Sequence, residues 1–130
     1  MDSLTVLRVD WFGEESATVT LSSGQAEVSV FCWPCEVSPG GQVVNALSCG
    51  LDGDLQAGCL DDWPAELKAE RSVPRLERWP GKGPFAWRGC GRVVDAERGI
   101  VEVLGFAIAF GECPAPDGAV VEFSCERLDL

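Results

Sequence analysis

Two cysteines at the end of an alternating segment form the sharpest motif in this chain. The tetrapeptide Cys32-Trp33-Pro34-Cys35 separates two thiols by two residues. Thiols at this spacing form a disulfide or share a metal ion, so the motif suggests redox chemistry or metal binding. Cys32 and Cys35 are therefore the candidate thiol or metal pair.

The residues around this pair do not favour redox catalysis. A proline in the third position resembles the redox sites of thioredoxin-type proteins, in which the pair opens a helix whose N-terminus stabilises the first thiolate. Here Glu36 and the turn residues 39–41 follow, which exclude a long helix, and the charge of Glu36 opposes thiolate formation. The alternative is that Cys32 points inward as a small apolar residue and that Cys35 occupies a turn.

The chain contains no histidine and no tyrosine. Histidine is the usual general base and a usual metal ligand, so serine triads, cysteine–histidine dyads and histidine metal sites are excluded. The remaining cysteines do not show the compact ligand pairs of structural zinc sites, so we expect neither a metal nor a cofactor. An enzymatic role is not favoured, and the odd number of cysteines, seven, argues against a fully paired disulfide framework.

One basic segment interrupts an acidic chain. The net charge is −11, yet residues 66–92 carry seven bases and three acids. The candidate partner-binding or anion-binding residues of this segment are Arg71, Arg75, Arg78, Trp79, Lys82, Trp87 and Arg88.

Three interpretations of the basic segment are open. Cations with interleaved aromatic rings grip phosphates and stack bases. The segment can instead neutralise the acidic body from within, and we favour this because a charge of −11 opposes a polyanion beyond a Debye length of about 8 Å. Thirdly, Trp79 and Trp87 can anchor a protein partner, since tryptophan is enriched at interface hot spots.

Alternating apolar residues predict strands in the first third of the chain. Period two in residues 17–22 and 27–32, with Ser23-Gly24-Gln25 between them, predicts a β-hairpin. An upstream strand is expected to present one apolar face, formed by Thr5, Leu7, Val9 and Trp11.

The middle of the chain is less regular. Residues 43–47 are expected to form a strand and the glycine-rich residues 50–60 a loop. Asp62 is a good N-cap and Pro64 suits a first turn, so a short helix is expected over residues 62–71. Residues 72–85 are expected to be irregular.

The last third again predicts strands. Residues 93–94 and 100–103 flank a turn that ends at Gly99. The apolar phase changes at Gly105 and again near residues 126–127, and each change predicts a β-bulge. Bulged, bent strands are what closing a small barrel requires.

The fold class is therefore all-β: a small bent antiparallel barrel, OB-like or related, of about seven strands with one short helix in a long connection. The length of 130 residues suits a single domain over residues 1–130, with a basic helix and loop insertion at about 61–85. The N-terminus does not resemble a signal peptide and no apolar run reaches the length of a membrane span, so a cytoplasmic, bacterial protein without a membrane partner is expected.

Three functional hypotheses follow. The first is a non-enzymatic binding module with a protein partner, because the catalytic groups are missing and the acidic field favours basic partners. The second is an OB-like nucleic-acid-binding barrel that uses residues 68–92, although the acidic charge disfavours nucleic acid. The third is a thiol-redox or metal protein that uses Cys32 and Cys35. The sequence leaves the identity of the partner and the oligomeric state open.

Overall fold

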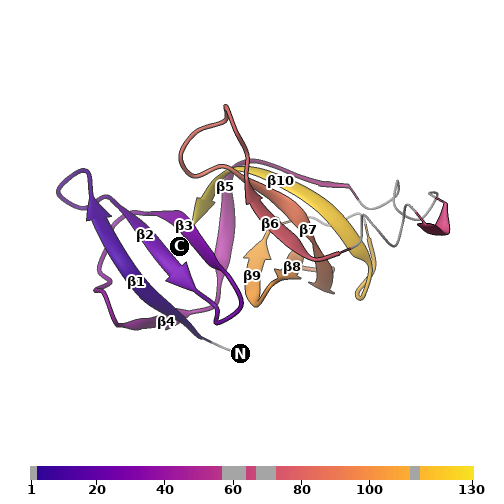
Figure 1. Cartoon of the computed structure of the whole chain (residues 1–130), viewed down its shortest axis with the longest axis horizontal. Helices are drawn as coiled ribbons and strands as arrows, with labels where there is room; N and C mark the ends of the chain where they lie inside the picture. The colour runs from indigo at the N-terminus through magenta and orange to yellow at the C-terminus, as the bar shows by residue number, and fades with distance from the viewer. Residues whose placement is uncertain (1–2, 57–63, 67–72, 112–114) are drawn as a thin grey trace.

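The computed structural model describes residues 3–56, 64–66, 73–111 and 115–130. Ten strands form within these residues (Figure 1). They are β1 (Ser3–Trp11), β2 (Ala17–Ser22), β3 (Glu27–Cys32), β4 (Gln42–Val44), β5 (Leu47–Gln56), β6 (Arg75–Arg78), β7 (Trp87–Asp95), β8 (Ile100–Val103), β9 (Phe106–Ala109) and β10 (Val120–Asp129). The all-β class is confirmed, with more strands than the sequence predicted.

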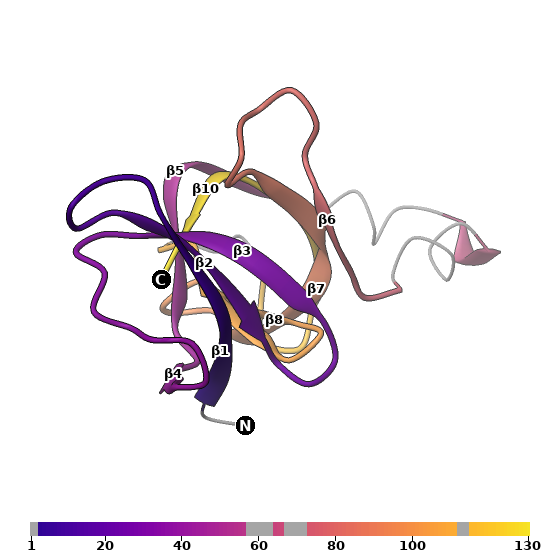
Figure 2. The same cartoon turned by 60° about the vertical axis from the view of Figure 1, so that its left-hand side comes forward.

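Five of the strands close a barrel. The strand order is β4-β1-β2-β3-β10-β5-β9-β8-β7-β6, and β10 also pairs with β7, which joins β5, β9, β8, β7 and β10 into a ring. The strands β4, β1, β2 and β3 continue the same sheet outside the barrel, where β3 pairs with β10, and they come forward in Figure 2. The predicted small barrel is confirmed. The barrel is not wholly antiparallel, because β5 pairs with β9 in parallel. Outside the barrel, β3 also pairs with β10 in parallel.

Two strand features were predicted correctly. The β2–β3 hairpin pairs Ala17 with Cys32 and Ser22 with Glu27, because alternating residues on both strands bury one face. The register between β10 and β5 shifts between Arg127 and Leu128, at the position where the apolar phase of the sequence changes.

The phase change at Gly105 has a different cause from the predicted bulge. Leu104 and Gly105 both have positive φ, of 48° and 88°, and they form a two-residue turn that pairs Val103 with Phe106. Positive φ at both central residues is the signature of a type I′ hairpin. The chain therefore reverses between β8 and β9, and both sides of the turn bury their apolar residues.

The predicted apolar row of the first strand was wrong. Leu4 and Val6 are buried, whereas Leu7 and Trp11 are exposed. The register against β2 shifts between Val6 and Arg8, and this extra residue changes which side chains face inward.

Three further expectations in the middle of the chain differ from the structure. Residues 72–85 were expected to be irregular, but Arg75–Arg78 form β6 because they pair with β7. Residues 50–60 were expected to form a loop, but β5 continues to Gln56 because its backbone pairs with β10. Of the predicted helix over residues 62–71, only Ala65 and Glu66 have helical backbone among the described residues, and the other described residue there, Pro64, does not. Among the described residues, no helix is long and apolar enough to span a membrane.

Gly91 is needed where β7 passes between its neighbours in the barrel. It pairs with Val121 of β10, and a Cβ atom there would lie 2.5 Å from the carbonyl oxygen of Glu102 and 2.8 Å from Cγ1 of Val101. Both contacts are shorter than van der Waals distances. A side chain at this position therefore forces β8 away from β7.

We expect Gly91→Ala to lower the free energy of unfolding by about 2–3 kcal/mol, which is the usual effect of overpacking. Chemical denaturation measures this change. Val94→Ala in the same strand is the control, because Val94 is half-exposed and its loss is expected to change stability by less than about 1 kcal/mol. Equal midpoints for the two variants would show that β7 and β8 do not approach this closely.

Candidate functional site: an exposed aromatic surface

Cys32 and Cys35 are buried free thiols at the end of β3. The thiol of Cys32 donates to the carbonyl oxygen of Pro34 at 4.0 Å. Burial raises the pKa of Cys32 to about 12, and a hydrogen bond with Cys35 acts in the same direction. A thiol with this pKa stays protonated at neutral pH, so it is a weak nucleophile and a weak metal ligand.

The other described thiols have similar surroundings. Burial raises the pKa of Cys90, and a hydrogen bond with Cys49 together with burial raises the pKa of Cys125. Cys59 and Cys113 lie outside the described residues. Within the part of the chain that the structure describes, no group of three or more histidine, cysteine, aspartate or glutamate residues could hold a metal ion.

Three basic side chains of the predicted cationic segment have acidic partners. Arg75 lies 3.4 Å from Glu122 in β10, and Arg88 lies 3.1 Å from Glu77 in β6. The Nζ atom of Lys82 lies 3.7 Å from a carboxylate oxygen of Glu126. These ion pairs connect the segment to the barrel and to itself.

The aromatic residues of the same segment also have partners inside the molecule. Arg78 lies over the ring of Trp87 at 5.5 Å and donates to the carbonyl oxygen of Pro84 at 2.7 Å. Trp87 is buried, and its indole N–H donates to the carbonyl oxygen of Ser29 in β3 at 2.9 Å. Lys82 lies over the ring of Trp79 at 5.2 Å. Arg71 lies outside the described residues.

A different set of aromatic residues is exposed at the far end of the β1–β3 sheet. Trp11 is 54% exposed, Phe12 58% and Trp33 63%. The register places these residues at the same end of the sheet, since Trp11 pairs with Ala17, and Ala17 pairs with Cys32, the residue before Trp33. Trp11 and Phe12 are consecutive, so their side chains leave opposite faces of β1. The sequence analysis missed this surface. We call Trp11, Phe12 and Trp33 the aromatic end.

Packed aromatic rings support the aromatic end from the neighbouring elements. The ring centroid of Phe12 lies 6.0 Å from that of Phe31 in β3 and 6.2 Å from that of Phe85 in the β6–β7 loop. Phe31 and Phe85 contact each other edge to face at 5.4 Å. Arg127 lies over the ring of Phe31 at 4.8 Å, and two hydrogen bonds to Asp129 hold its guanidinium in place. The base of this surface is therefore fixed before any partner arrives.

Acidic side chains surround the aromatic end. Glu14 and Glu15 follow Phe12 in the β1–β2 loop, and Glu36 follows Trp33 by three positions. All three glutamates are exposed. The backbone N–H of Cys35 donates to the carbonyl oxygen of Glu15 at 2.7 Å, which ties the two loops together. The surface thus combines apolar rings with negative charge.

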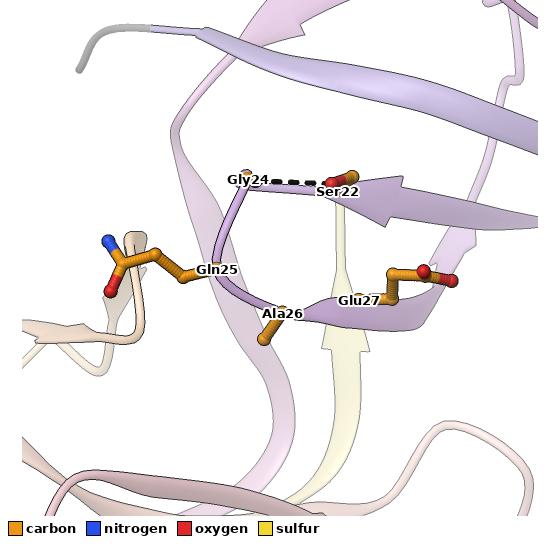
Figure 3. Close-up of a pocket in the computed structure, with 5 residues that line it drawn as sticks. All are labelled: Ser22, Gly24, Gln25, Ala26 and Glu27. Atoms are coloured by element: carbon orange, nitrogen blue, oxygen red, sulfur yellow. Dashed lines mark hydrogen bonds between the residues drawn. The ribbon is translucent and has the colours of Figure 1, made fainter.

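A surface hollow lies at the turn between β2 and β3 (Figure 3). It is lined by Ser22, Gly24, Gln25, Ala26 and Glu27. Its shape follows from the turn, in which the backbone N–H of Gly24 donates to the Ser22 hydroxyl at 3.1 Å. Glu27 is the one titratable residue of this lining, so no pair of groups is available there for acid–base catalysis.

Sequence signals for the aromatic end exist, but they are weak. The chain reaches Trp11 and Phe12 just before the Gly13-Glu14-Glu15 turn, and Trp33 follows the last apolar position of a strand. These signals do not show that the side chains are exposed, and only the register shows that the three residues lie at the same end of the sheet. No protein-family model, no curated protein and no solved structure matches this chain.

Proposed function

We propose that this protein is a non-enzymatic binding module that captures a basic protein partner through its aromatic end. The observation that carries the proposal is the exposure of Trp11, Phe12 and Trp33 beside acidic loops. Large apolar side chains exposed at one end of a small protein are typical of an interaction site. Tryptophan is also among the residues that contribute most to binding at interfaces.

The charge of the chain supports a basic partner. A net charge of −11 creates a field that accelerates encounter with cations and repels anions, and this effect weakens as salt is added. Glu14, Glu15 and Glu36 place part of this charge next to the aromatic rings. The partner surface that fits best therefore presents lysine or arginine beside apolar side chains.

The ring of strands supports a second, more specific interpretation of the barrel. β7, β8 and β9 form a meander, β10 is antiparallel to both β7 and β5, and β5 is parallel to β9. These are the neighbours of an OB barrel whose last strand has moved to the front of the chain, and we propose that relationship. Since OB barrels include nucleic-acid binders, single-stranded nucleic acid is the competing ligand.

The ion pairs of the basic segment weigh against nucleic acid. Arg75, Lys82 and Arg88 each lie within 4 Å of a carboxylate, so a phosphate has to displace an existing partner. We also propose the cytoplasm as the compartment, because Cys32, Cys35, Cys90 and Cys125 are free thiols and the cytosol keeps thiols reduced.

Calorimetric titration tests the proposed function. The probes are a synthetic peptide of alternating lysine and valine, and oligothymidylate of similar length. We expect the peptide to bind at about 50 mM salt and to bind more weakly as salt is raised, while oligothymidylate does not bind. Binding of oligothymidylate without binding of the peptide would overturn the proposal in favour of the nucleic-acid alternative.

The double variant Phe12→Ser/Trp33→Ser is expected to weaken peptide binding by about tenfold or more, since hot-spot side chains contribute more than about 1 kcal/mol each. Val94→Ser is the matched control, because it removes an exposed apolar side chain from β7. Equal losses in the two variants would place binding elsewhere on the molecule.

A further inference from the structure

The outer edge of β1 is covered along only part of its length. β4 pairs with residues 3–5, and Val6 exchanges backbone hydrogen bonds with Gly40 and Gly41. From Leu7 to Trp11, β1 pairs with β2 on one side, and no described strand pairs with it on the other. About half of β1 therefore has no strand partner on its outer side among the described residues. The β3–β4 connection passes on that side, and backbone hydrogen bonds hold it to Val6 and to Glu15 (Figure 2).

The hydrogen-bond pattern shows which backbone groups face that edge. The N–H of Phe12 donates to the carbonyl oxygen of Ser16 at 3.1 Å, so this is a hydrogen-bonded antiparallel pair. Such pairs alternate along a ladder, so Asp10 and Arg8 also bond to β2. The N–H and C=O groups of Val9 and Trp11 consequently point away from β2, toward the open edge.

The side chains along this edge differ between its two faces. Val9 and Trp11 lie opposite Val19 and Ala17, which are fully buried, so both belong to the inner apolar face. Arg8 and Asp10 lie on the other face, exposed and joined by an ion pair of 2.7 Å. An added strand could continue the inner face over Val9 and Trp11.

We infer that the Leu7–Trp11 edge of β1 accepts an extended segment of the basic partner as an additional antiparallel or parallel strand. The inference rests on the proposed function and specifies its binding mode. Main-chain hydrogen bonds to Val9 and Trp11 supply affinity, and alternate apolar side chains of the segment cover the exposed ring of Trp11. Lysine or arginine at the other positions complements the acidic molecule.

A second copy of the chain is a poorer occupant of the same edge. Each copy carries a net charge of −11, so two copies repel each other, whereas a basic segment is attracted. Native proteins that leave a strand edge open usually protect it, and here the protecting charges amount to one ion pair, Arg8–Asp10. The edge is therefore available to a strand of opposite charge.

Amide hydrogen exchange measured by NMR tests the inference on the intact chain. The probe is the alternating lysine–valine peptide. At saturation we expect the exchange of the Val9 and Trp11 amides to slow by about tenfold or more, with little change at Asp10, whose amide already bonds to β2. Binding without protection at Val9 and Trp11 overturns the inference and leaves the proposed function intact.

The other outcomes are also distinguishable. If no basic peptide binds at low salt, the proposed function and the inference both fail. If the two amides are protected without peptide and sedimentation shows a dimer, a second copy occupies the edge and the inference is overturned.

A pair of variants isolates the backbone contribution. Val9→Pro removes an N–H that β2 does not use, whereas Val9→Ala keeps this N–H and loses more of the apolar side chain. We expect the proline variant to bind the peptide about tenfold more weakly than the alanine variant, with native exchange rates at Val19 and Leu21 as proof of folding. If both variants fold and bind the peptide with equal affinity, the inference is contradicted. If the proline variant does not fold, the amide exchange of the unmodified chain tests the inference instead.

Discussion

Phe106→Ala is expected to destabilise the protein by about 3–5 kcal/mol, which is the usual effect of emptying a buried phenylalanine site. Phe106 is fully buried in β9, one residue after the β8–β9 turn, and belongs to the largest buried side chains of the core. Removing its ring leaves a cavity inside the barrel and loses the apolar surface that the ring buries. Urea denaturation measures the change.

Phe12→Ala is the matched control for this prediction. The chemical change is the same, but Phe12 is 58% exposed and lies outside the barrel. We expect a loss of about 1 kcal/mol or less, arising from its contacts with Phe31 and Phe85. A larger loss at Phe12 than at Phe106 would mean that the barrel does not hold the core.

Alkaline pH is expected to destabilise the protein because three buried thiols resist ionisation. The pKa values of Cys32, Cys90 and Cys125 are all raised, that of Cys32 from an ordinary 9.0 to about 12. The unfolded chain therefore loses these protons at lower pH than the folded chain. The contribution to stability is complete below about pH 9 and is lost as pH rises toward the folded values.

The expected loss is about 1.4 kcal/mol per thiol at pH 10, because a pH one unit above the unfolded pKa favours the unfolded chain by that amount. Cys32 and Cys125 together lower stability by about 3 kcal/mol between pH 8 and pH 10, and Cys90 acts in the same direction. Urea denaturation at the two pH values measures this difference, and Cys32→Ala is expected to flatten the dependence by up to about half. A stability that is constant over this range would show that the thiols ionise as freely in the folded chain as in the unfolded one.

The parts of the fold that depend on local alternation were predictable. The β2–β3 hairpin and the bulge near Arg127 follow from period two and from a change of phase, which the sequence displays directly. At Gly105 the same kind of phase change has another cause, a two-residue turn between Val103 and Phe106. A bulge and a tight hairpin both shift the apolar phase, so tertiary pairing decides between them.

Features that depend on partners distant in sequence could not be predicted. β5 contains Gly50, Asp52, Gly53 and Asp54, a composition that is typical of a loop, and it is a strand because β10 supplies a long antiparallel partner. The inward residues of β1 change at the bulge after Val6, which no local pattern indicates. The parallel pairing of β5 with β9 likewise joins segments that are far apart in the chain.

The candidate sites were predicted from residue type. The exposure of the aromatic end depends instead on how the strands pair, which residue type does not show. Cys32 and Cys35 form the clearest motif of the sequence, yet both thiols are buried and free. The cations of the basic segment are visible in the sequence, but their acidic partners, such as Glu122 and Glu126, come from β10. Trp11, Phe12 and Trp33 lie at the same end of the sheet only because β1, β2 and β3 align their ends.

The most direct test compares two double variants in one titration with the alternating lysine–valine peptide. Phe12→Ser/Trp33→Ser alters the aromatic end, and Arg78→Ser/Lys82→Ser alters the basic segment. The proposed function predicts that the first variant loses about tenfold or more in affinity and that the second binds as well as the unmodified chain or better, since it removes positive charge. Loss of binding in the second variant with full affinity in the first would contradict the account.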